Sequence, residues 1–138
     1  MFRRLDERTL VAGQVEPGDI AQAAEAGVTM VINNRPDDES PGQPAGSAVE
    51  AAARAAGLDY RAIPITHSGF STNQVDAMRA ALEAAGDGAV LAFCRSGTRS
   101  TLVWALARNA MGDDPDALAG KAASAGYDLS PVLPFMKR

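Results

Sequence analysis

The chain of 138 residues contains one cysteine, one histidine and one tryptophan, so it is poor in the residue types on which several kinds of site depend. A single cysteine cannot form an internal disulfide, which agrees with a reducing compartment. One cysteine and one histidine are too few for a zinc site, and no cluster of Asp, Glu, His and Cys has the spacing of metal ligands. We therefore expect neither a metal nor another cofactor.

Positive charge and long apolar stretches are also scarce. The 13 Lys and Arg against 17 Asp and Glu give a net charge of −4, which argues against nucleic acid as a partner because phosphate backbones are bound by clustered basic side chains. A small anionic substrate is compatible with this charge, since a local pocket can be positive on an acidic protein. No apolar run approaches the roughly 18 residues that span a bilayer, and the N-terminus turns acidic at Asp6-Glu7 without an apolar signal core. We expect a cytoplasmic protein that does not bind membranes.

Apolar, strand-like segments alternate with helical segments along most of the chain, in a composition typical of soluble globular proteins. The expected strands are 9–14, 28–32, 58–63 and 89–93. The expected helices begin at Pro17 and cover 47–56, 71–86 and 100–111, with two short ones after Asp114 and Ser130. This alternation predicts an α/β fold in one domain, 1–138, with a central, mostly parallel sheet flanked by helices and right-handed crossovers.

The segment after the last predicted strand, Cys94-Arg95-Ser96-Gly97-Thr98-Arg99-Ser100, carries the strongest chemical signal. Backbone N–H groups in a turn of small residues, with a helix N-terminus behind them, form a positive nest for an anion. Gly97 allows a backbone conformation that a Cβ would resist, and Arg99 offers a planar fork of donors to an oxyanion. We expect the anion to be bound by Arg99 and by the rest of the loop: Arg95, Ser96, Gly97, Thr98 and Ser100.

The same positive field acts on the sulfur of Cys94. Helix N-termini and nearby arginines favour the thiolate over the thiol, and Ser96 or Ser100 could add a hydrogen bond. We therefore expect Cys94 to be largely ionised at neutral pH and to act as a covalent nucleophile. The alternative is a buried cysteine that simply ends a strand, but a strand end of that kind needs neither two arginines nor a glycine.

The order strand, cysteine, small polar loop, arginine, serine and helix resembles the active-site loop of protein tyrosine phosphatases and of rhodanese-type sulfurtransferases. Arg99 follows Cys94 as Cys-x4-Arg, the spacing typical of rhodaneses, whereas protein tyrosine phosphatases carry Cys-x5-Arg. Nearly the whole chain resembles the phosphatase-like domain named after the beta-lactamase hydrolase-like proteins. Three motifs carry this resemblance: 11–14 followed by Pro-Gly-Asp, 31–39, and 94–100.

This resemblance implies a fold like that of protein tyrosine and dual-specificity phosphatases. It also implies that Cys94 is the sulfur- or phosphoryl-accepting nucleophile and that Arg99, with the loop amides, binds the anion. Some members are fused to persulfide dioxygenase-like metallo-hydrolases or to sulfide-oxidising enzymes. The resemblance therefore further implies handling of sulfane sulfur and a partner of that kind.

The residues themselves bear on the choice between these two reactions. A phosphatase needs an acid to protonate the leaving group, and the loop expected over the site, 64–70, contains no carboxylate and only His67 as a titratable group. Transfer from thiosulfate or a persulfide expels sulfite or a thiolate, which leave without protonation, and the shorter loop encloses less volume. The sequence thus favours sulfane-sulfur transfer through a Cys94 persulfide. A cysteine-dependent phosphatase acting on a phosphate ester through a phosphocysteine is the alternative, and a non-catalytic anion-binding module is the second.

Two further residues have two interpretations each. His67 is either the acid or a loop residue without a catalytic role. Arg35 follows a strand at the edge where parallel sheets place their active sites. It either holds the substrate anion or pairs with a carboxylate of Asp37, Asp38 or Glu39.

Overall fold

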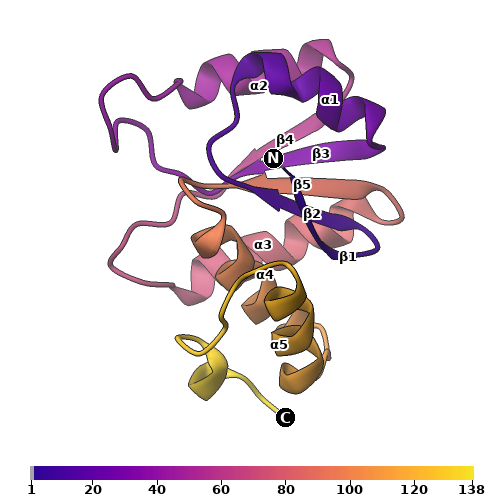
Figure 1. The fold of residues 1–138 in the computed structure, drawn as a ribbon, viewed down its shortest axis with the longest axis vertical. Helices are drawn as coiled ribbons and strands as arrows, with labels where there is room; N and C mark the ends of the chain where they lie inside the picture. The colour runs from indigo at the N-terminus through magenta and orange to yellow at the C-terminus, as the bar shows by residue number, and fades with distance from the viewer. Residues whose placement is uncertain (1) are drawn as a thin grey trace.

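Five strands form a single sheet in the computed structural model, which describes residues 2–138 (Figure 1). The strands are β1 (Arg3–Asp6), β2 (Thr9–Ala12), β3 (Val28–Asn33), β4 (Asp59–Ala62) and β5 (Ala89–Phe93). Their order across the sheet is β1-β2-β5-β3-β4, and only the β1–β2 pair is antiparallel. The predicted architecture, a mostly parallel sheet flanked by helices, is confirmed.

Helices cover both faces of this sheet. The short α1 (Ile20–Glu25) and α2 (Gly46–Ala55) lie on one face, and α3 (Thr72–Ala85), α4 (Thr98–Ala110) and α5 (Pro115–Ser124) lie on the other side (Figure 1). Central strands covered on both faces are expected to be apolar throughout rather than alternating. In agreement, the last four residues of β3 and the last four of β5 are all buried.

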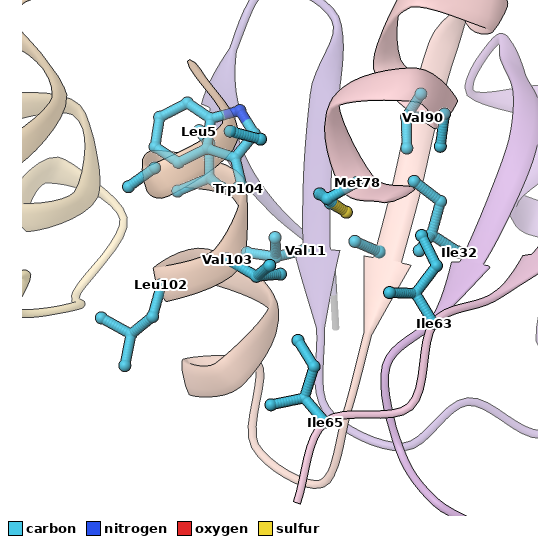
Figure 2. Packing of buried hydrophobic residues seen from close by; sticks show 14 of the residues in the cluster. Leu5, Val11, Ile32, Ile63, Ile65, Met78, Val90, Leu102, Val103 and Trp104 are labelled. Carbon is cyan, nitrogen blue, oxygen red and sulfur yellow. The ribbon is translucent and has the colours of Figure 1, made fainter. Parts of the chain in front are cut away.

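The two faces of the sheet belong to two separate apolar clusters. On β5, Val90 and Ala92 pack with the helices α3 and α4, whereas Leu91 and Phe93 pack with α1 and α2. This division follows from the strand geometry, in which successive side chains point to opposite faces. Figure 2 shows the larger cluster, where Trp104 and Val103 of α4 and Met78 of α3 lie over the strands. The cluster fixes α4 against the sheet and so fixes the loop that precedes it.

Several element boundaries differ from the sequence-based prediction. The strand β1 was not predicted, and the helix α4 begins at Thr98, two residues before the predicted start. Ser47 does not cap α2, whose N-cap residue is Ala45 with no side-chain hydrogen bond. The segment after Ser130 forms only a 3-10 turn at Leu133–Phe135. Within residues 2–138, none of the helices has both the length and the apolar character required to cross a bilayer.

The predicted capping box at the start of α3 is confirmed. The Ser71 hydroxyl accepts a hydrogen bond from the Gln74 N–H at 3.2 Å, and the Gln74 side-chain oxygen accepts one from the Ser71 N–H at 2.8 Å. These two bonds satisfy N–H groups that the first helical turn leaves without partners. The loop 64–70 is therefore anchored at its C-terminal end, where α3 begins.

Candidate active site

Cys94 lies at the carboxyl edge of the parallel strands, directly after β5. The segments that follow β2 and β3 leave the sheet at the same edge, because parallel strands end on one side. The side chain of Cys94 is completely buried, and its own N–H donates to the Ala12 carbonyl at 3.4 Å. The predicted nucleophile is therefore part of the sheet edge and lies at the floor of the site.

The loop after Cys94 turns one of its backbone donors toward the sulfur. The Gly97 N–H donates to Cys94 Sγ at 3.1 Å. Gly97 has φ +90°, a left-handed conformation that glycine adopts at no steric cost. The helix α4 starts at the next residue, and Thr101 donates through its N–H at 3.0 Å and its hydroxyl at 2.8 Å to the Gly97 carbonyl. The turn is thus fixed by the first helical residues behind it.

The end of β2 supports the loop from the other side. A Cβ on Gly13 would lie 2.9 Å from the carbonyl oxygen of Arg95, closer than real Cβ contacts allow. The backbone N–H of Gln14 donates to the same oxygen at 3.3 Å. The backbone of the motif 11–14 therefore packs closely against the cysteine loop, which explains why residue 13 is a glycine.

Ser100 has a supporting position. Its hydroxyl is completely buried and donates to Asn34 Oδ1 at 2.8 Å. Asn34 in turn donates through Nδ2 to the Ile63 carbonyl at 3.0 Å and through its N–H to the Phe93 carbonyl at 2.8 Å. The Ser100 hydroxyl, which was predicted to serve the anion or the sulfur, thus ties α4 to the ends of three strands.

Arg99 holds a carboxylate in its guanidinium fork. Its two terminal nitrogens donate to the two oxygens of Glu39 at 2.7 and 2.8 Å, and one of them also donates to the Ile65 carbonyl at 2.6 Å. The hydrogen bond from Arg99 is the largest cause that lowers the pKa of Glu39 to about 2, against the opposing effect of burial. The pKa of Arg99 is raised, mainly by this bond and further by the negative charge of Cys94, while burial lowers it.

Arg35 meets the same carboxylate from the other side. Its Nε donates to Glu39 at 2.9 Å, and its terminal nitrogens donate to Gln14 Oε1 at 3.0 Å and to the Ser40 hydroxyl at 2.9 Å. Its side chain is only 5% exposed. All three nitrogens are therefore used within the protein, as in the interpretation that pairs Arg35 with a carboxylate. Arg35 reaches the site through Glu39 and through Gln14, whose N–H donates to the Arg95 carbonyl.

The remaining predicted residues lie at the rim of the site. The side chain of His67 is 76% exposed, and its Nε2 lies 3.9 Å from Glu39 Oε2. Arg95, Ser96 and Thr98 are exposed. The Ser96 hydroxyl accepts from the Thr98 N–H at 3.4 Å and donates to the Thr98 hydroxyl at 3.1 Å. The Ser96 hydroxyl therefore bonds to the first residue of α4, while the Arg95 side chain is exposed to solvent.

Two contributors were not predicted as site residues. Glu39 appeared only as a partner for Arg35, although its place in the segment after β3, at the carboxyl edge, was a usable signal. Tyr127 donates its hydroxyl to the Ser96 carbonyl at 3.1 Å from a segment 31 residues away, and no local pattern indicates this contact. Across residues 2–138, no group of three or more His, Cys, Asp and Glu side chains could hold a metal ion.

Comparison with known proteins identifies the family. Residues 1–111 match the family model described as the phosphatase-like domain of beta-lactamase hydrolase-like protein. A beta-lactamase hydrolase-like protein of Xylella fastidiosa is 34% identical over 97% of this chain, but the match covers only 31% of that relative's length. Activities of the whole relative are therefore not carried over to this chain.

Solved structures agree in fold. The crystal structure of a candidate phosphatase from Neisseria meningitidis has a TM-score of 0.80 and 30% identity, with 96% of this chain and 94% of that chain covered. Tk-PTP in its active form has a TM-score of 0.73, with 94% and 87% covered, and at 18% identity it shows the fold alone. The fold is that of protein tyrosine phosphatase-like proteins. By its family match, the chain belongs to the phosphatase-like domains of the beta-lactamase hydrolase-like proteins.

Proposed function

We propose that this chain is a cysteine-dependent phosphatase that hydrolyses small phosphate esters through a phosphocysteine at Cys94. The observation that carries the proposal is the state of Arg99, which holds the two oxygens of a carboxylate in its fork at 2.7 and 2.8 Å, beside the buried sulfur. Two oxygens of a phosphate present the same geometry to a guanidinium. A substrate phosphate would replace Glu39 there and would lie next to the Gly97 N–H and the sulfur.

The reaction would proceed in two displacements. In the first, the Cys94 thiolate attacks phosphorus, an S–P bond forms, and the P–O bond to the leaving group breaks. In the second, water attacks the phosphocysteine, the S–P bond breaks, and inorganic phosphate and the thiolate are released. Arg99 and the loop amides would stabilise the charge on the phosphoryl oxygens in both steps.

The leaving alcohol needs a proton, and the site offers a donor at its rim. His67 is exposed and lies 3.9 Å from Glu39, so it would stand near a leaving group whose phosphate is bound at Arg99. Glu39 is a poor acid as long as Arg99 holds its pKa at about 2. We therefore assign the proton transfer to His67 and assign to Glu39 the role of occupying Arg99 when no substrate is bound.

The lack of a carboxylate in the loop 64–70, one reason for which the sequence favours sulfur transfer, does not exclude a phosphatase. His67 of this loop lies 3.9 Å from Glu39, which Arg99 holds, so His67 would supply the proton in place of a carboxylic acid. The family match and the related structures are phosphatase-like as well.

Sulfane-sulfur transfer remains the second candidate, on one observation. Only three residues separate Cys94 from the start of α4, and the sulfur is completely buried, which suits a single terminal sulfur atom better than a bulky ester. In that reaction, the Cys94 thiolate would attack the outer sulfur of thiosulfate, form an S–S bond and release sulfite. An acceptor thiolate would then take the outer sulfur and regenerate Cys94.

One pair of assays separates the candidates. The phosphatase proposal expects turnover of p-nitrophenyl phosphate that is lost in Cys94→Ser. Sulfur transfer expects thiosulfate or glutathione persulfide to add about 32 Da to the protein, removable by a reducing agent and absent in Cys94→Ser. A sulfur adduct without phosphate release would overturn the first proposal in favour of the second. If neither phosphate release nor a sulfur adduct is detected, the chain is a module that only binds anions.

A further inference from the structure

The peptide unit between Ser96 and Gly97 has hydrogen-bond partners on both sides. Its N–H, from Gly97, donates to Cys94 Sγ at 3.1 Å, and its C=O, from Ser96, accepts from the Tyr127 hydroxyl at 3.1 Å. In a trans peptide unit the N–H and the C=O point in opposite directions within one plane. The Tyr127 hydroxyl therefore holds, from the far side, the direction in which the N–H points at the sulfur.

The unit would be free to turn without this contact. Gly97 has φ +90°, and glycine populates positive and negative φ about equally. Half a turn of the plane would bring φ of Gly97 to negative values and would place the Ser96 oxygen, instead of the N–H, toward the sulfur. A carbonyl oxygen repels a thiolate and a bound anion, whereas an N–H stabilises both. The two orientations of one peptide plane thus have opposite effects on the reacting groups.

Tyr127 is itself held by contacts with both ends of the chain. Its N–H donates to the Ala122 carbonyl at 2.9 Å, in the turn that ends α5. The Arg3 guanidinium lies 5.6 Å from the centre of its ring and donates to the Ala125 carbonyl at 2.9 Å. A Cβ on Gly97 would overlap the Tyr127 hydroxyl, so the two residues are in close contact. The ring that carries the hydroxyl is therefore held from outside the cysteine loop, by Arg3 of β1 and by the turn that ends α5.

The hydroxyl also keeps its proton. Burial raises the pKa of Tyr127, Arg3 lowers it, and the negative charge of Cys94 raises it further, with a net increase above the usual value for tyrosine. Tyr127 is therefore a donor throughout the neutral range, as the bond to the Ser96 carbonyl requires.

We propose that Tyr127 is a positioning residue of the cysteine loop: its hydroxyl keeps the Ser96–Gly97 peptide unit turned with the N–H toward Cys94 and so sustains the thiolate. This inference deepens the proposed function and rests on it for its catalytic meaning. Its effect on the sulfur, however, can be measured without any assumption about the substrate. Tyr127 lies beyond residue 111, where the family match ends.

The test uses Tyr127→Phe, which keeps the ring under Arg3 and deletes only the hydroxyl. Because Cys94 is the single cysteine, iodoacetamide reports on it alone. The alkylation rate is measured as a function of pH, and the readout is the pH at which the rate is half its maximum. A change in the accessibility of the sulfur alters the rate by the same factor at every pH, whereas a change in its ionisation moves this midpoint. We expect the midpoint to move upward by about one pH unit, as for the loss of one N–H bond to a charged sulfur. For p-nitrophenyl phosphate we expect kcat to fall about tenfold, with KM changed by less than about twofold.

The matched control is Tyr60→Phe, the other tyrosine of the chain. It deletes a buried hydroxyl that accepts from Asn33 Nδ2 at 3.0 Å, away from the cysteine loop. Its alkylation midpoint should equal that of the native protein. Three charged or titratable side chains lie near the sulfur: Arg99 interacts with it, Glu39 contacts Arg99, and His67 lies 3.9 Å from Glu39. Neither variant changes any of these side chains.

An unchanged midpoint in Tyr127→Phe would overturn the positioning role, whichever reaction the protein catalyses. Absence of p-nitrophenyl phosphate turnover in the native protein would overturn the phosphatase proposal and leave the alkylation midpoints to decide on Tyr127. Should Tyr127→Phe lack a cooperative thermal transition, Arg3→Lys replaces it. That change keeps the charge but loses the planar group over the ring. A smaller upward shift is expected there, and no shift would contradict the proposal.

Discussion

The carboxylate of Glu39 lies in the guanidinium fork of Arg99, with both oxygens within 2.8 Å of a terminal nitrogen. The two residues are 60 positions apart in the chain, and Arg99 also lies next to the completely buried sulfur of Cys94. A carboxylate bound in this way occupies the position where an anionic substrate is expected. Glu39 and the substrate should therefore compete for one arginine.

Arg99→Lys tests whether the fork, rather than the charge, binds the anion. Lysine keeps the positive charge but cannot present two parallel donors, so we expect kcat/KM for p-nitrophenyl phosphate to fall about 100-fold. Arg61→Lys is the control, because Arg61 is half exposed and pairs with Asp59 at 3.0 Å. Activity of Arg99→Lys within a few-fold of the native protein would show that a point charge is sufficient.

Glu39→Gln tests the competition. The amide keeps the shape of the side chain but lacks the charge that holds it in the fork, so inorganic phosphate should bind about tenfold more tightly and inhibit accordingly. Titration calorimetry gives the dissociation constant directly. Glu83→Gln is the control, because Glu83 forms an exposed pair with Arg79 at 3.4 Å. Weaker phosphate binding in Glu39→Gln would instead mean that Glu39 orients Arg99 for the substrate.

The same carboxylate should make the protein sensitive to acid. The pKa of Glu39 is lowered from 4.5 to about 2, so its stabilising contribution is complete above about pH 4.5 and is lost as the pH falls toward about 2. The contribution is at most about 3 kcal/mol, and solvent screening reduces it. Urea unfolding at pH 6 and pH 3 should show a larger loss of stability for the native protein than for Glu39→Gln. Equal losses would show that the ion pair does not contribute.

His67→Gln should affect substrates according to their leaving groups. p-Nitrophenolate leaves without a proton, whereas an alkyl phosphate needs an acid, whose removal costs about 100-fold or more. We therefore expect a large decrease in kcat for the alkyl phosphate and a change of less than about threefold for p-nitrophenyl phosphate. If both substrates respond equally, His67 acts on binding or on structure and does not donate the proton.

Gly97→Ala should be more damaging than the same change at Gly57. Both glycines have positive φ, +90° and +81°, so alanine costs about 1–2 kcal/mol at either position. Nothing lies within 4 Å of a Cβ on Gly57, whereas at Gly97 the Cβ would overlap the Tyr127 hydroxyl. Thermal melting should show the additional loss, and only Gly97→Ala should lose activity. Equal melting temperatures would mean that Tyr127 moves aside at little cost.

The sequence predicted the parts of this molecule that depend on local patterns. The apolar run 89–93, Gly97 and the helix behind it suffice to place Cys94 between a buried strand and a helix N-terminus, because a strand, a turn and a helix start are each encoded by adjacent residues. The capping box at Ser71 and Gln74 is local in the same sense.

What could not be predicted depends on contacts between distant segments. The strand β1 has two arginines and an aspartate among its four residues, and its place in the sheet comes from antiparallel pairing with β2 and from burial of Leu5. The Glu39–Arg99 pair requires the segment after β3 to meet the first turn of α4 at the carboxyl edge of the sheet. The segment after β3 contains three acidic residues in a row, 37–39, and the path of its backbone decides that Glu39 makes the contact.

The contact between Tyr127 and Ser96 also bears on where the working unit ends. A polypeptide cut after residue 111 would keep the whole cysteine loop and every residue of the family match, yet it would lack the hydroxyl that orients the amide facing the sulfur. It would also expose the apolar surface that α5 covers. In this protein, the match to the family model ends before the side chain to which we assign the orientation of the cysteine loop.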